Sequence, residues 1–213
     1  MQTEILRSRW RTGVLVAMLA LSGCASMSKN ECLTVDWRTV GFEDGAAGYP
    51  ADRIGQHRKA CAKHGVTPDL AAYQSGREQG LREYCRPQNG FRVGSRGSGY
   101  DGSCPADMDE AFTRAYESGR QLYTLESRVA DVNYRMESKR QEINAAEQDI
   151  VTNSALAVSK DATAEERAAA VVDVKQLAER VGRLRAEIPQ LEVELSRCEQ
   201  DLEDYRAHLE YPQ

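Results

Sequence analysis

The stretch Trp37–Tyr49, WRTVGFEDGAAGY, carries a pattern of small residues that returns twice later in the chain. The pattern runs Gly41-x-Glu43-x-Gly45-x-x-x-Tyr49, then Gly76-x-Glu78-x-Gly80-x-x-x-Tyr84, then Ala115-x-Glu117-x-Gly119-x-x-x-Tyr123. On a helix, the first small residue, the glycine four positions later and the tyrosine eight positions later share one face. Since such a face lets a second backbone approach closely, the repeat predicts short helices crowded together in a small bundle.

The first two copies lie in residues 34–85, which predict three short helices. Thr34 can cap the first helix, and Pro50 stands where the second would start. Thr67 can cap the third helix, with Pro68 in its first turn. This part of the chain is therefore expected to be helical throughout.

Residues 86–103 differ in composition from both neighbours. Pro87 to Gly90 predicts a turn, and the following Phe91-Arg-Val segment predicts a short strand. The glycines after it predict an open Gly-rich loop, whose spacing matches neither the Walker nor the dinucleotide-binding pattern. Candidate ligand-binding residues in this segment are Arg92, Arg96 and Tyr100.

From Pro105 onward, the apolar residues follow alternating steps of three and four. One series runs from Met108 to Ile150 and a second from Val174 to Leu209. Two series of this length, with Glu and Arg around them, are typical of an antiparallel coiled-coil hairpin. We expect the hairpin to cover residues 105–210, with arms near 107–150 and 163–209 and a turn at about 151–162.

Two features mark the second arm of this hairpin. Thr163 and Glu166 have the spacing of a capping box, which predicts the start of a helix. Pro189 removes one backbone hydrogen bond and is expected to kink the arm. The whole chain is therefore predicted to be all-α, with a small helical module at residues 34–104 followed by the hairpin.

The N-terminus carries a sequence that resembles the lipobox of bacterial lipoproteins, Leu21-Ser-Gly-Cys24. It closes nine uncharged residues from Gly13, a run too short for a bilayer, which needs ~20 apolar residues. The resemblance implies a signal peptide at residues 1–23, acylation of Cys24 and a tether at 24–33. Because Ala25 follows the cysteine, the resemblance implies the periplasmic face of the outer membrane, with the inner membrane as the alternative.

The cysteines indicate that the chain is exported to an oxidising compartment. With Cys24 assigned to lipid, four of the remaining five cluster in the helical module, where thiols of an exported protein become disulfides. Three pairings are possible. We favour Cys32 with Cys61 and Cys85 with Cys104, because both pairs close short loops and would staple a module with few aromatic residues. The fifth, Cys198, lies in the hairpin seam and either packs as a small apolar residue or bridges two chains.

The helical module also resembles a known family. The matching pieces are Trp37-x-x-x-Gly41-Phe-Glu-Asp-Gly45, His57-Arg-Lys-Ala-Cys61, Tyr73-x-x-Gly76-Arg-Glu-x-Gly80 and Tyr84-Cys85. They are similar to an uncharacterised family of proteobacterial envelope lipoproteins, a domain of unknown function, over about residues 24–125. The resemblance implies an envelope location and a disulfide-bearing module, and it brings no catalytic residues.

Two groups of residues have the spacing of functional sites, and each group also has a simple structural explanation. His57, Cys61 and His64 have the helical spacing of metal ligands, but a cysteine in a disulfide is a poor ligand, so we expect no metal and no cofactor. Glu43, Glu78 and Glu117 could supply paired carboxylates for glycan hydrolysis, which needs two carboxyls ~5–9 Å apart. With 3 Phe and 2 Trp in the chain, an aromatic sugar cleft is not expected, and we do not favour an enzyme.

The sequence therefore predicts a lipid-anchored periplasmic protein that serves as a structural or adaptor component of the envelope. Its partner would be another protein or a second copy of the chain, contacted through residues 107–209. A ligand-binding module for a cell-wall fragment or an anionic small molecule is the alternative, using the three glutamates and the Arg92, Arg96 and Tyr100 segment. A net charge of −5 argues against nucleic acid as a partner.

Overall fold

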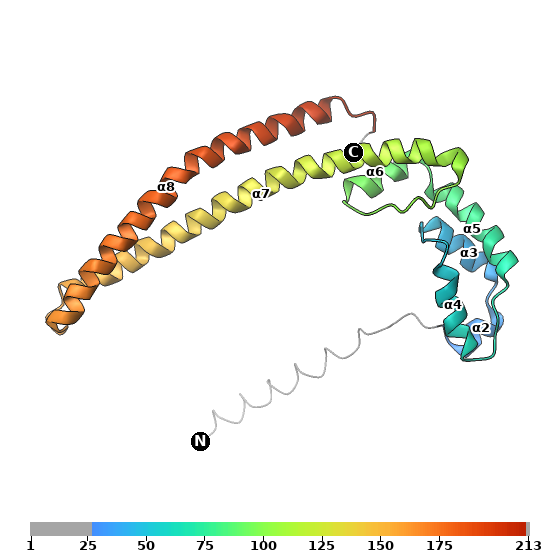
Figure 1. Ribbon diagram of the computed structural model, residues 1–213, viewed down its shortest axis with the longest axis horizontal. Helices are drawn as coiled ribbons and strands as arrows, with labels where there is room; N and C mark the ends of the chain where they lie inside the picture. Colours follow the sequence, from blue (N-terminus) through green and yellow to red (C-terminus); the bar gives the residue numbers. More distant parts are fainter. Residues whose placement is uncertain (1–26, 212–213) are drawn as a thin grey trace, which may run out of the picture. The chain divides into compact units, whose positions relative to one another are not determined.

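The computed structural model describes residues 27–211, and all of its regular structure is helical (Figure 1). The all-α prediction is confirmed over this range, since no strand occurs in it. The expected signal peptide and Cys24 lie outside the described residues. The helices are α2 (Lys29–Thr34), α3 (Trp37–Ala46), α4 (Arg53–Ala62), α5 (Leu70–Tyr84), α6 (Pro87–Ser95), α7 (Ala106–Ala157) and α8 (Ala164–Ala207).

The chain divides into two compact units. Unit 1 comprises Met1–Arg86 with Asp101–Asp109, and unit 2 comprises Pro87–Tyr100 with Glu110–Gln213. Across residues 27–211, no helix combines the length and the apolar character needed to cross a membrane. Each unit contains one pair of helices whose backbones touch, and these pairs organise the rest of the fold.

The helix starts in unit 1 lie slightly later than the sequence suggested. Asp36, not Thr34, caps α3, because its carboxylate accepts the backbone N–H of Arg38 at 3.1 Å. Asp69, not Thr67, caps α5 in the same way. The tether expected at residues 24–33 includes most of α2, which carries its own capping box.

In unit 1, helices α3 and α5 run parallel with their backbones in direct contact. A Cβ atom added to Gly41 would lie 2.0 Å from the carbonyl oxygen of Tyr73, and one added to Gly76 would lie 1.8 Å from that of Arg38. Such distances leave no room for a side chain. The glycines one turn later in each helix, Gly45 and Gly80, are equally enclosed, at 2.3 and 2.1 Å. The crowding predicted from the repeat is therefore present.

In unit 2, α6 packs against the first part of α7 in the same manner. A Cβ atom on Gly94 would lie 2.1 Å from the carbonyl oxygen of Tyr116, and one on Gly119 would lie 2.2 Å from that of Phe91. The turn and strand predicted over residues 87–93 are thus wrong. Pro87 suits a first helical position, and close packing against α7 outweighs the low helix propensity of the two glycines in α6.

The two helix pairs match position by position, which indicates an internal duplication. Gly48 and Gly97 both adopt positive φ, 74° and 72°, and each faces a tyrosine ring, that of Tyr84 or Tyr123. In unit 1, Arg77 Nη2 donates to the carbonyl oxygen of Tyr49 at 2.8 Å. At the equivalent positions of unit 2, Tyr116 Oη donates to that of Ser98 at 3.1 Å. Gly41, Gly45, Gly76 and Gly80 thereby correspond to Gly90, Gly94, Ala115 and Gly119.

Each disulfide joins the segment before the first helix of a pair to the segment before the second. The bonds are Cys32–Cys61 and Cys85–Cys104, the pairing that the short-loop argument favours. Their sequence separations, 29 and 19 residues, correspond to roughly 3 kcal/mol of stabilisation each in the chain-entropy picture. The bonds therefore hold together the ends at which each parallel pair begins.

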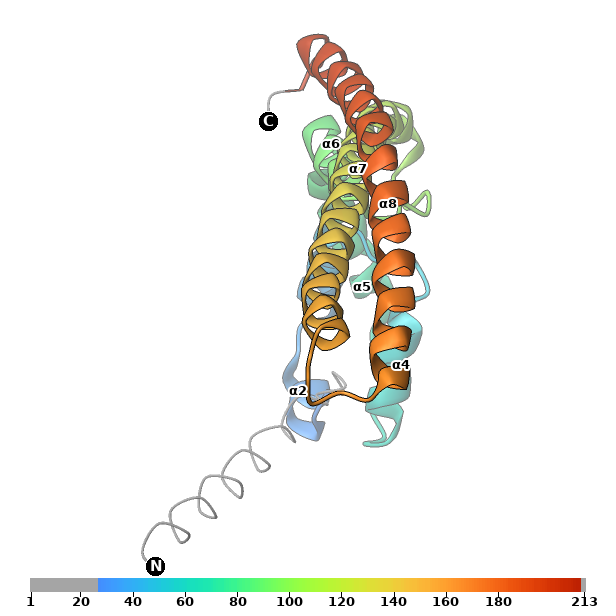
Figure 2. The ribbon, with the colours of Figure 1, turned by 90° about the vertical axis from the view of Figure 1, so that its left-hand side faces the viewer.

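Helices α7 and α8 form the predicted antiparallel hairpin, with α8 returning alongside α7 (Figures 1 and 2). Apolar seam residues pack in successive layers, for example Ile143 and Ala146 against Val181 and Leu184. The capping box of Thr163 opens α8 as predicted. The connection is shorter than the expected turn at 151–162, because α7 continues to Ala157. Helix α8 continues through Pro189 without a break.

Ion pairs flank the seam on both sides and fix how the arms align. Within the described residues, seven of them join α7 to α8. Each exposed pair is worth little alone, but a slip of one turn would separate the opposite charges together. The pairs are Glu126–Arg206, Arg128–Asp201, Arg135–Glu194, Lys139–Glu187, Arg140–Glu192, Glu142–Arg180 and Glu147–Arg185.

Replacing Gly76 by Ala should lower the free energy of unfolding by about 3 kcal/mol or more, because the new methyl group meets backbone that cannot move aside. Gly55 in α4 is the matched control, since a Cβ there has nothing within 4 Å. Gly55→Ala should be neutral or stabilise by up to about 1 kcal/mol. Urea unfolding of both variants measures the difference, and equal effects would exclude backbone contact at Gly76.

Candidate functional site

A buried carboxylate, Asp44, connects three helices of unit 1. It projects from α3, is 6 % exposed, and accepts hydrogen bonds from Tyr73 Oη at 2.7 Å and from His57 Nε2 at 2.8 Å. Arg53 Nε lies 3.8 Å from the other carboxylate oxygen. Since Arg53 and His57 belong to α4 and Tyr73 to α5, this one side chain ties α4 to the α3–α5 pair.

Aromatic rings surround this carboxylate. The His57 ring lies between Trp37 and Tyr73, with ring centroids 6.3 and 6.1 Å apart. Burial, reinforced by the hydrogen bond to Asp44, raises the pKa of the Tyr73 hydroxyl well above its ordinary value. Tyr73 therefore stays protonated and serves as a hydrogen-bond donor.

The duplication shows what the carboxylate is for. Val93 and Phe112 stand in unit 2 where Asp44 and Tyr73 stand in unit 1, and both are buried. Unit 2 joins its two helices without a helix in between, whereas unit 1 inserts α4. Since the glycine-packed pair forms with either an apolar or a polar filling, we attribute the Asp44 network to holding α4.

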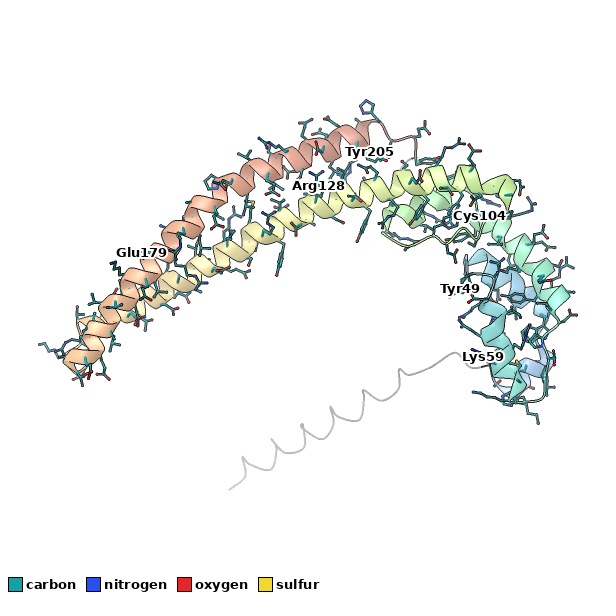
Figure 3. The ribbon with its side chains drawn as sticks, in the orientation of Figure 1. Tyr49, Lys59, Cys104, Arg128, Glu179 and Tyr205 are labelled. Carbon is teal, nitrogen blue, oxygen red and sulfur yellow. A yellow bond between two sulfur atoms is a disulfide. The ribbon has the colours of Figure 1, made fainter. Side chains whose placement is uncertain are left out.

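Helix α4 forms one wall of a cavity of about 330 Å³ in unit 1. The other walls come from α5 and from the segment that follows α6, where Cys104 is bonded to Cys85. Cys104 is labelled in Figure 3. Most of the lining is apolar, and Arg77 and Glu78 supply the charged groups. The lining residues are Ala51, Ile54, Leu70, Tyr73, Gln74, Arg77, Glu78, Leu81, Ser103, Cys104 and Pro105.

The three glutamates singled out from the repeat are all exposed. Glu78 lines the cavity, while Glu43 and Glu117 do not. Glu43 stands between Gly41 and Gly45 in α3 and is exposed, so its side chain points away from the glycine face, as the helical spacing predicted. The pattern thus located the right helices, but the buried acid is Asp44, which sequence reasoning passed over.

The Arg92, Arg96 and Tyr100 segment is not a single loop. Arg92 lies on α6 and donates to Asn89 Oδ1 at 2.8 Å. Tyr100 packs against Phe112 and Tyr116, with ring centroids 4.7 and 5.7 Å apart. Tyr100 therefore holds the loop against α7, and Arg96 is left exposed in that loop.

The cysteine and histidines that have the spacing of metal ligands make other contacts in the structure. Cys61 is bonded to Cys32, so its sulfur is not available to a metal, and His57 contacts Asp44. Within residues 27–211, no group of three or more His, Cys, Asp or Glu is placed to hold a metal ion. Cys198 is a buried free thiol that packs with Val132 in the hairpin seam.

Comparison with known proteins identifies one domain. The sequence profile described as "Protein of unknown function (DUF2799)" matches residues 36–121. This segment begins at the cap of α3 and ends two residues after Gly119, so it contains both glycine-packed pairs and leaves out most of the hairpin. No curated protein and no solved structure matches the chain.

Replacing Asp44 by Val should destabilise the protein by about 3 kcal/mol, because Tyr73 and His57 lose their common acceptor. Combining Asp44→Val with Tyr73→Phe copies the apolar pair of unit 2. We expect the double variant to recover about 1–2 kcal/mol relative to the sum of the single variants. Its α4 amides should exchange faster with deuterium, while those of α3 and α5 remain protected.

The control for this experiment is Asp52→Val, since Asp52 precedes α4 and its side chain makes no capping hydrogen bond. It should change stability by less than about 0.5 kcal/mol. If α4 stays as protected in the double variant as in the unaltered protein, Asp44 does not hold that helix.

Proposed function

We propose that the chain is a lipid-anchored envelope protein on the periplasmic face of the outer membrane, where it acts as a structural or adaptor component through its hairpin. The lipobox-like sequence ending at Cys24 supports the anchor. Two disulfides within about 75 residues support an oxidising compartment, since such bonds are rare in the cytosol.

The seam of the hairpin is already filled by apolar side chains of its own two arms. Val132, Met136, Leu191 and Cys198 pack together there, and ion pairs close both sides. A partner would therefore contact other surfaces of the hairpin. Helix α8 alone has 44 residues, about 65 Å at 1.5 Å per residue, so the turn of the hairpin lies far from the other end of its arms.

The observation that carries this proposal is the apolar tip of the hairpin, defined as residues 151–172. It contains Val151 and Val158, which are 70 % and 80 % exposed, and three more exposed apolar side chains. The other exposed residues there include several alanines and the charged Lys160, Asp161, Glu165 and Glu166. Exposed apolar side chains within one short stretch favour an interaction site. The other three are Leu156, Val171 and Val172.

A photo-crosslinking amino acid at Val158 should trap one discrete protein partner in intact cells, because the tip is the expected contact. The same amino acid at Glu179, an exposed position on the arm (Figure 3), is the matched control and should trap little. Cys24→Ser should release the protein from the membrane fraction and abolish the Val158 crosslink. Electrophoresis and mass spectrometry identify the product.

Three outcomes would each contradict a part of this proposal. Equal crosslinking at Val158 and Glu179 would mean that the tip is not a specific contact. A mature protein that stays in the membrane fraction after Cys24→Ser, or that carries no fatty acid, would mean that the lipid anchor is wrong. A crosslink only between copies of the chain would replace the adaptor role with self-association.

A further inference from the structure

Helices α2 and α4 carry exposed cations at one end of unit 1. This basic end is defined as Lys29 of α2 together with Arg58, Lys59 and Lys63 of α4 and its C-cap, and all four side chains are exposed. Lys59 is labelled in Figure 3. The sequence from Arg53 to Pro68 contains no Asp or Glu. Among the described residues, the arginines of unit 1 that pair with carboxylates are others, namely Arg53, Arg82 and Arg86.

The acidic residues nearest to the basic end in the sequence have partners of their own. Glu31 accepts the backbone N–H of Ser28 at 2.6 Å, Asp36 accepts that of Arg38 at 3.1 Å, and Asp69 accepts that of Ala72 at 3.0 Å. Each of these carboxylates lies at the N-terminus of a helix, where the helix dipole favours negative charge. The cations of the basic end therefore face solvent without a carboxylate partner among the described residues.

The helix dipole explains only part of this arrangement. Cations near the C-terminus of a helix are favourable, which gives Lys59 and Lys63 a structural role in α4. Lys29 is the first residue of α2, where the same dipole disfavours a cation, and Arg58 precedes the last turn of α4. A common role for all four residues therefore requires an anionic partner outside the chain.

The position of the proposed lipid anchor indicates which partner this is. Met27 packs in the cluster around the first disulfide, and its Sδ lies 3.9 Å from Cys61 Sγ at the end of α4. Cys24 precedes Met27 by three residues, which span at most ~11 Å in any conformation. An acyl chain on Cys24 would therefore hold the basic end close to the membrane surface, where surface charge acts over ~10 Å at 0.1 M salt.

The chemistry of the basic end fits the phosphates of anionic phospholipids. Each Lys or Arg close to an anionic bilayer strengthens binding by about fivefold. The net charge of −5 does not prevent this contact, because charges farther from the bilayer than the screening length of ~10 Å act weakly. Building on the lipid anchor proposed above, we propose that the basic end binds anionic phospholipid headgroups of the membrane that carries the anchor, so that α4 faces the bilayer.

Vesicle flotation tests this contact without the anchor. The oxidised chain of residues 24–213 with Cys24→Ser carries no acyl group, and it should float with vesicles of phosphatidylcholine and phosphatidylglycerol in equal amounts. It should not float with phosphatidylcholine alone, and about 1 M salt, where the screening length is ~3 Å, should release it. Arg58→Gln should weaken binding about fivefold. Combining it with Lys59→Gln and Lys63→Gln should reduce binding to the level of the neutral vesicles.

The matched control removes three exposed cations of α8, by Lys175→Gln, Arg183→Gln and Arg197→Gln, and should bind as the chain with Cys24→Ser alone does. Thermal unfolding shows whether each triple variant is folded, and Arg58→Gln alone tests the site if the α4 variant is not. The proposal is overturned if the mixed vesicles do not bind the chain, if neutral vesicles bind it equally well, or if both triple variants weaken binding alike. A mature protein without fatty acid contradicts the anchor alone, since no acyl group takes part in the flotation.

Discussion

Direct contact between helix backbones is the constraint on which the rest of this structure depends. In each unit, two parallel helices approach so closely that carbonyl oxygens of one helix occupy the space where the other would carry side chains. Glycine costs about 1 kcal/mol in a helix interior, so a helix with two of them needs compensation from packing. The close contact supplies it, and the disulfide at the start of each pair keeps the helices from separating.

The duplication lets unit 2 serve as a reference for unit 1. In unit 2, which has no helix between its two paired helices, the buried Val93 and Phe112 fill the space beside the glycine contact. In unit 1, which has α4, Asp44 and Tyr73 stand at these positions, and the carboxylate of Asp44 contacts His57 and Arg53 of α4. The polar network and the cavity beside it are therefore features of unit 1 beyond what the fold requires.

Much of the fold could be predicted from the sequence because its strongest signals are periodic. The hairpin follows from two long apolar series, and the small-residue repeat located α3, α5 and the start of α7. Helix α6 was missed because Gly90 and Gly94, next to a proline and an asparagine, look like a turn unless their partner on α7 is known. Asp44 was missed for a similar reason: nothing local distinguishes a buried aspartate from the exposed Glu43 beside it. Both depend on contacts between segments far apart in the sequence.

Proton NMR of the unaltered protein tests the backbone contact most directly. Nuclear Overhauser effects between Hα atoms of different helices require separations below about 5 Å, which helices packed through ordinary side chains, with axes about 8–10 Å apart, rarely reach. The account predicts such cross-peaks between Gly45 and Gly80 in unit 1 and between Gly94 and Gly119 in unit 2. Their absence in a folded, oxidised sample would contradict it.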